Sequence, residues 1–75
     1  MDTIIDALDL SGIRYEKVND NEVFLPNWEG GTMSIVYDPI SGYCEVTQTW
    51  RDTHGHLQTA VGTYPARNAE AWFNY

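Results

Sequence analysis

The side chains with the greatest potential for chemistry lie close together around Gly55. His54 and His56 flank this glycine, and Asp52 lies two residues before the first histidine. Two imidazoles and one carboxylate are also the ligands of a facial-triad metal site. However, Asp-Thr-His-Gly-His is typical of a hairpin turn, where exposed ligands lack the surrounding groups that would orient them. We therefore expect a turn here, with no metal site and no bound cofactor.

The single cysteine, Cys44, offers a thiol that could act as a nucleophile. Its neighbour Glu45 would raise the pKa of this thiol, whereas a nucleophilic cysteine needs a lowered pKa. Free cysteines are usually small buried residues, so we expect Cys44 to be buried in a strand. The sequence contains no Gly-x-Ser-x-Gly motif and no phosphate-binding loop. We predict no catalytic residue and no enzyme activity.

Three carboxylates near the start of the chain have helical spacing. Asp2, Asp6 and Asp9 follow one another at i, i+4 and i+7, which places them in one stripe about 5–6 Å apart on a helix. Aspartate is a poor helix former, so three in nine residues suggest a purpose. A basic groove that normally holds nucleic acid could accept such a stripe in place of phosphates. The alternative is an ordinary solvated face that keeps the protein soluble.

A tryptophan next to a carboxylate forms the second candidate binding feature. Trp28 precedes Glu29 in a segment, residues 27–32, that also contains two glycines and is expected to be a loop. Exposed loop tryptophans often anchor protein partners. Alternatively, Trp28 folds back over the sheet edge. We include Trp28, Glu29 and the nearby Glu16 with the three aspartates as candidate partner-binding residues, and assign Trp50 to the core.

The overall charge limits the classes of partner. The 75 residues include 4 Lys and Arg but 11 Asp and Glu, which gives a net charge of −7. Such a chain is unsuited to direct binding of nucleic acid or of anionic membranes, because both require basic patches. Its length predicts a single domain over residues 1–75. The absence of a signal-peptide pattern predicts a cytoplasmic protein, in the host cytoplasm if a phage encodes it.

The elements that must position these residues are predicted by periodicity and turn signals. A first helix is expected at residues 2–10, ended by Gly12 in a Schellman motif with Ile13. A last helix is expected to begin at Pro65, with Ala66, Ala69, Trp72 and Phe73 on one face. Between them, the sequence predicts strands at residues 13–18, 22–25, 33–37, 43–51 and 57–63.

Short connections between the strands predict antiparallel neighbours. We therefore predict a two-layer α+β domain with an antiparallel meander sheet of four to five strands. In the chain, an N-terminal helix precedes the sheet and a C-terminal helix follows it (order αβββββα). Both helices are expected to cover the same face of the sheet. A rolled, half-open small barrel is the alternative fold.

These observations favour a non-catalytic, acidic protein-binding module. We expect an inhibitor that occludes the basic, nucleic-acid-binding surface of a larger protein or complex, of the kind encoded by phages or mobile elements (anti-CRISPR-like or anti-restriction-like in class). It would be a monomer or weak homodimer. The alternative is a small structural or assembly subunit acting through a sheet edge or the polar sheet face. A metal-binding module or tiny enzyme centred on the histidines is a third hypothesis.

Overall fold

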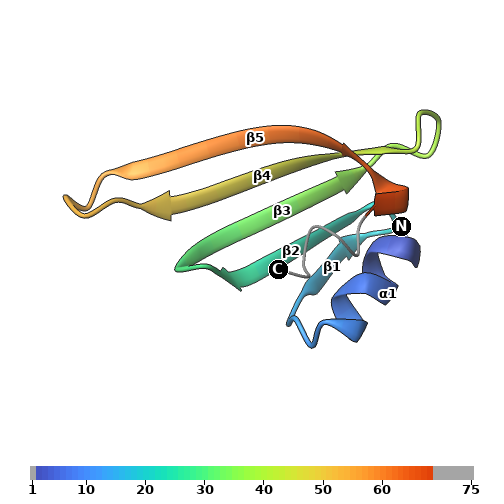
Figure 1. Cartoon of the computed structure of the whole chain (residues 1–75), viewed down its shortest axis with the longest axis horizontal. Helices are drawn as coiled ribbons and strands as arrows, with labels where there is room; N and C mark the ends of the chain where they lie inside the picture. Colours follow the sequence, from blue (N-terminus) through green and yellow to red (C-terminus); the bar gives the residue numbers. More distant parts are fainter. Residues whose placement is uncertain (1, 69–75) are drawn as a thin grey trace.

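The computed structural model describes the backbone of residues 2–68 and the side chains of residues 3–68. One helix precedes a sheet of five strands, and a short 3-10 helix follows it (Figure 1). The elements are α1 (Asp2–Leu10), β1 (Glu16–Asn19), β2 (Glu22–Trp28), β3 (Gly31–Tyr37), β4 (Tyr43–Arg51), β5 (Leu57–Pro65) and η1 (Ala66–Asn68).

The sheet is the antiparallel meander that the short connections predict. The strand order is β1-β2-β3-β4-β5, and every neighbouring pair is antiparallel. Within residues 2–68 the sheet is open, with β1 and β5 at its two edges, so the alternative of a rolled barrel is wrong. The longest pairing joins β4 to β5, from Tyr43 opposite Pro65 to Arg51 opposite Leu57.

The first helix ends as its sequence predicts. The backbone N–H of Ile13 donates to the carbonyl of Leu8 at 3.0 Å, and that of Gly12 donates to the carbonyl of Asp9 at 3.2 Å. This pair of bonds is the Schellman motif, and it requires the positive φ of 67° found at Gly12. The motif turns the chain back toward the sheet.

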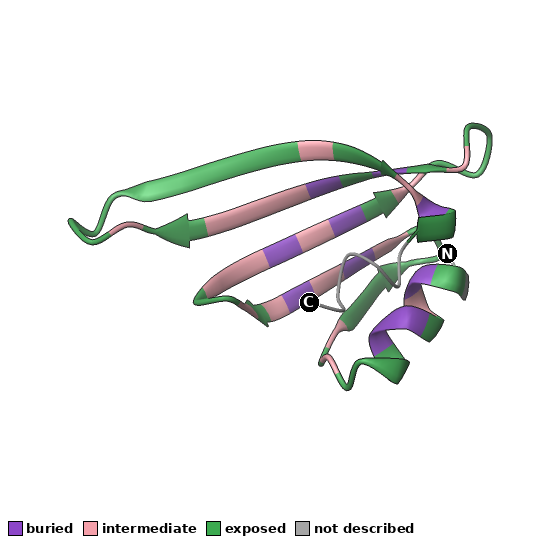
Figure 2. Ribbon diagram, viewed as in Figure 1, coloured by how far each residue is buried: buried purple, intermediate pink, exposed green. Residues whose placement is uncertain are grey.

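One face of the sheet and the apolar face of α1 form the core (Figure 2). Ile4 and Leu8 of α1 are fully buried, as are Val23, Leu25 and Ile35 of the sheet. Buried residues alternate with partly exposed ones along β2 and β3, and the partly exposed residues form the other face of the sheet. No element of the described part of the chain covers that face, so residues 2–68 form two layers, one of helix and one of sheet.

The second hairpin differs from the prediction. Residues 27–32 do not form a loop, because β2 continues through Pro26 to Trp28 and β3 begins at Gly31. The pairing register shifts between Leu25 and Trp28. Pro26 lies in this irregularity, where a residue without an N–H is tolerated within a sheet. The proline therefore marks a bulge and not the end of the strand.

The C-terminal helix is confirmed only as a short turn. Pro65 does not begin a helix, since it is the last residue of β5 and pairs with Tyr43. The chain then forms the 3-10 turn η1, in which Ala66 is buried in the same core that α1 covers. The N–H of Ala66 donates to the carbonyl of Gly42 at 3.0 Å. The expected helical face at Ala69, Trp72 and Phe73 lies outside the described residues.

The described helices are short. None of those within residues 2–68 has the length and apolar character required to cross a bilayer.

Candidate functional site

The outer surface of α1 carries two of the three carboxylates of the predicted acidic stripe. Ile4 and Leu8 face the sheet and are fully buried, whereas Asp6 and Asp9 are exposed. An amphipathic helix buries one stripe and turns its polar residues to solvent. Asp2 is the first residue of α1, and its side chain lies outside the described part of the structure. Two of the three carboxylates are therefore placed on the solvent side of a helix.

Tyr15 lies beside these carboxylates, just before β1. Its side chain packs against the core. Burial first, then the charge and the hydrogen bond of Asp9, and finally the charge of Asp6 raise the pKa of the Tyr15 phenol. The phenol is thus protonated at neutral pH and donates to the Asp9 carboxylate. Asp6 and Asp9 are three residues apart in α1, so they lie on the same side of the helix.

Glu16 lies on the other face of the sheet. It pairs with Phe24 of β2, whose neighbours Val23 and Leu25 both point into the core. Since successive side chains alternate between the two faces, Glu16 points to the open face. The structure therefore does not bring Glu16 together with the carboxylates of α1.

Trp28 and Glu29 lie at the tight turn between β2 and β3. Trp28 pairs with Gly31, so Glu29 and Gly30 are the two central residues of the turn. Their φ angles are 47° and 82°, both positive, as a type I′ turn requires. Glu29 is the one non-glycine residue with positive φ among residues 2–68. A glutamate is an unfavourable choice here, where Asn, Asp or Gly is usual.

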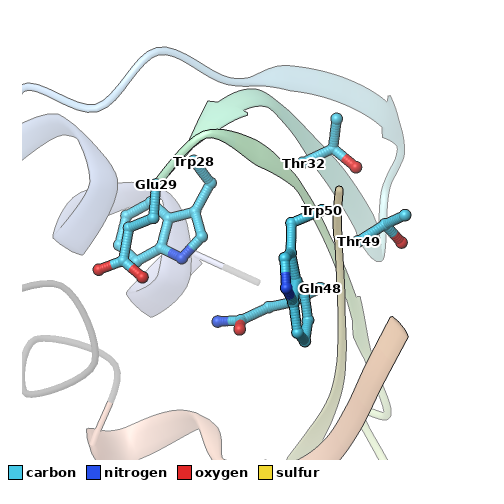
Figure 3. Close-up of a pocket in the computed structure, with 6 residues that line it drawn as sticks. All are labelled: Trp28, Glu29, Thr32, Gln48, Thr49 and Trp50. Atoms are coloured by element: carbon cyan, nitrogen blue, oxygen red, sulfur yellow. The ribbon is translucent and has the colours of Figure 1, made fainter. Parts of the chain in front are cut away.

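A cleft lies beside this turn, between two tryptophans (Figure 3). Trp28 is half-buried and packs against the core, and Trp50 of β4 forms the opposite wall with 37% of its surface exposed. The space measures about 260 Å³. Its lining is completed by Glu29, Thr32, Gln48 and Thr49. The lining thus combines two indoles with polar groups and one carboxylate.

The expectation that Trp50 belongs to the core is wrong. Its position alternates in phase with the buried Cys44 and Val46, so it does point to the face that α1 covers. However, a nine-residue helix is only about 14 Å long, whereas nine residues of strand extend about 30 Å. No residue of α1 lines the space beside Trp50, so the helix does not cover this end of β4. The alternation predicts which face the side chain occupies, but helix length decides whether that face is covered.

Gly31 holds the two walls of the cleft close together. A Cβ atom at this position would overlap the carbonyl oxygen of Thr49 and come within 2.9 Å of the Trp50 Cβ. Only glycine allows the start of β3 to approach β4 this closely. Because Trp28 pairs directly with Gly31, this approach also sets the separation of the two indoles.

No protein-family model, curated protein or solved structure matches this chain. The chemistry available to the cleft therefore follows from its own side chains. The faces of Trp28 and Trp50 attract cations through their π electrons. The carboxylate of Glu29 adds a negative charge, and none of the six lining residues is basic. Such a site suits a positively charged, partly apolar group.

The histidines lie in the turn between β4 and β5, and both are exposed. Asp52 organises this turn: one carboxylate oxygen accepts the backbone N–H groups of His54 and His56, both at 2.9 Å, and the other accepts the Gln58 side chain at 3.0 Å. The bond from His56 is the largest cause of a lowered pKa at Asp52. Within residues 3–68, no group of three or more potential ligands is placed to hold a metal ion.

Cys44 is a buried residue of β4, as expected. Its side chain is fully covered, and burial raises the pKa of the thiol. A raised pKa leaves less thiolate at neutral pH, and thiolate is the reactive form. The Cys44 side chain therefore contributes to packing.

Proposed function

We propose that this protein is a non-catalytic binding module that occludes a basic surface of a larger protein. The observation that carries the proposal is the cleft between Trp28 and Trp50, with Glu29 in its lining. The cleft opens on the face of the sheet that α1 also covers, and α1 presents Asp6 and Asp9 to solvent. An aromatic anchor and an acidic surface therefore belong to the same side of the domain.

The two features have different roles in this proposal. Clusters of carboxylates in a chain of net charge −7 attract a basic partner over long range and accelerate association. Affinity comes from a few buried aromatic contacts, and Trp is enriched among residues that dominate binding energy. An arginine side chain suits the cleft, because its planar guanidinium stacks on indole rings and pairs with a carboxylate. Each cation–π contact is worth about 0.5–2 kcal/mol.

Surfaces that bind nucleic acid are rich in arginine and lysine, which makes them natural targets for such a module. We therefore also propose the partner class: host machinery that handles nucleic acid, blocked by a small inhibitor of the phage or mobile-element type. Support for this class comes from the charge balance and from the carboxylates of α1. Glu16 faces away from this surface, so the proposed contact does not include it.

A peptide titration tests the cleft directly. An acetylated and amidated hexa-arginine peptide serves as the probe, and the same peptide built from citrulline is the neutral control. We expect saturable quenching of tryptophan fluorescence by the arginine peptide only. Trp50→Ala should weaken binding about ten-fold, or ~1.4 kcal/mol, since it removes one wall of the cleft. The matched control is Tyr43→Ala, which removes an equally exposed aromatic residue (41%) from the open face.

Charge reversal tests the acidic surface separately. Asp6→Lys combined with Asp9→Lys changes the net charge from −7 to −3, and so does the control pair Asp20→Lys with Glu45→Lys. We expect the α1 pair to slow association with the peptide more than the control pair does, with the difference shrinking as salt is added. Equal effects of the two pairs would show that only net charge matters. Equal binding of the arginine and citrulline peptides would refute the proposal.

A further inference from the structure

The two edges of the sheet differ in the protection that they carry against pairing with another chain. Strand edges are usually protected by short length, charged side chains or bulges. The β1 edge has all three: it is four residues long, contains Glu16 and Lys17, and its register shifts between Lys17 and Asn19. The β5 edge is nine residues long, contains no charged residue, and pairs in unbroken register with β4.

The β5 edge is also fully accessible. Residues 57–61, 63 and 64 are exposed, and Val61 retains 64% of its surface. Among the residues described, only β4 pairs with β5, so the N–H and C=O groups on the outer side of the strand lie at an edge of the sheet. Another extended strand would satisfy a row of them at once. Tyr64 lies over Gly62, where a Cβ atom would come within 2.7 Å of the phenol oxygen, and this contact stabilises the glycine in its extended conformation.

The sequence of β5 is complementary to itself. If two copies pair antiparallel with Val61 opposite Val61, then Thr59 lies opposite Thr63 and Ala60 opposite Gly62 on either side of the centre. Pairs of threonines and of β-branched residues are favourable cross-strand neighbours, and no like charges meet. A charged partner strand would find no ionic contact along this edge.

We infer that β5 is a homodimerisation edge, at which two copies form one continuous ten-stranded sheet. Residues that lie directly opposite in an antiparallel pair point to the same face. The two-fold axis is therefore normal to the sheet, and both α1 helices lie on one face of the dimer. This inference does not depend on the proposed function, although a dimer would present two copies of the acidic surface on the same side.

Sedimentation equilibrium over loading concentrations from about 1 μM to about 1 mM tests the inference. We expect reversible dimers, with association unchanged or strengthened by salt, since each copy carries a net charge of −7. Val61→Lys should weaken dimerisation at least about ten-fold by placing two lysines opposite each other. Val18→Lys, at a 55% exposed position on the β1 edge, should leave it unchanged.

A cross-linking experiment keeps the inference testable if the lysine variant folds poorly. Val61→Cys should form a disulfide-linked dimer with itself under mild oxidation by diamide, because the two-fold axis passes beside this residue. Val18→Cys is the control and should remain monomeric. A strict monomer at all concentrations, or cross-linking of Val18→Cys in place of Val61→Cys, would overturn the inference. Dimerisation is measured without the arginine peptide. Salt should weaken peptide binding and should leave dimerisation unchanged or stronger, so the two proposals can fail independently.

Discussion

Replacing Glu29 with asparagine should make the protein more stable and should weaken its binding to the hexa-arginine peptide. Glu29 has a φ of 47°, in the left-handed region. That region costs an ordinary L residue about 1–2 kcal/mol, whereas asparagine tolerates it far better. Glu29→Asn should therefore raise the free energy of unfolding by about 1 kcal/mol. Glu29→Gly should gain less, because glycine adds conformational entropy to the unfolded chain.

The gain is large enough to measure. For a domain of this size, 1 kcal/mol corresponds to a Tm increase of about 4–8 °C. Thermal melting and urea denaturation monitored by circular dichroism provide two independent values. The matched control is Glu16→Asn, which makes the same change in net charge at an exposed position of ordinary strand conformation. It should leave stability unchanged or lower it slightly, since asparagine is unfavourable in strands.

The same variant should bind the hexa-arginine peptide more weakly, because it removes the one carboxylate that lines the cleft. Stability and binding would then change in opposite directions, which is the trade-off expected where function maintains a strained residue. If Glu29→Asn melts no higher than the unmodified protein, the left-handed conformation carries no cost and the reasoning fails. If it binds as well as before, the carboxylate has no part in the site.

Three further predictions follow from the same geometry. Gly31→Ala should lower the free energy of unfolding by about 1–3 kcal/mol, because the added Cβ overlaps the carbonyl oxygen of Thr49. It should also abolish binding of the arginine peptide, whereas the control Gly12→Ala should bind the peptide normally. Asp52 has a lowered pKa in the folded state. Its stabilising effect is therefore present above the unfolded pKa of about 3.9 and is lost as the pH falls through the folded pKa. Thermal melting at decreasing pH should show a smaller loss of Tm in Asp52→Asn than in the unmodified protein. The Cys44 thiol should react with Ellman's reagent only after urea unfolds the protein, and fast labelling of the native state would contradict its burial.

Much of the fold could be predicted because local signals and tertiary packing agree. The apolar spacing of α1, its glycine terminator and the turn residues around Gly42 and Gly55 each act over a few residues. The register of β4 against β5 follows from such a turn, since a hairpin fixes the alignment of both strands. Elements specified by local chemistry were therefore the ones predicted correctly.

The errors have a common origin in interactions between distant segments. Pro26 usually ends a strand, yet β3 pairs around it through a bulge. Pro65 usually begins a helix, yet the long pairing with β4 draws it into β5. The sequence predicts Gly31 in a loop, and only the close approach of β4 shows why a glycine is needed at this position. No single segment contains this information, because each outcome depends on which strand the fold places alongside.

The candidate site shows the same division. The sequence identified Trp28 and Glu29, but it placed them in a loop and assigned Trp50 to the core, so the cleft between the two tryptophans could not be foreseen. Tyr15 was also missed as the partner of Asp9, because only the return of the chain after α1 brings them together. The alternation of side chains along a strand predicts the face on which a residue lies. The length of the helix that packs on that face then limits how much of it is covered.

The departures from local rules are concentrated around this cleft. Glu29 occupies a left-handed position, Pro26 lies within a paired strand, and Trp50 is left partly uncovered on the core side of the sheet. Natural sequences tend to violate such rules where function requires it. Glu29 and Trp50 line one space of about 260 Å³, and Pro26 lies two residues before Trp28, which also lines it. Each would be relieved by a common substitution, and the binding that we propose at the cleft would explain why the sequence contains all three.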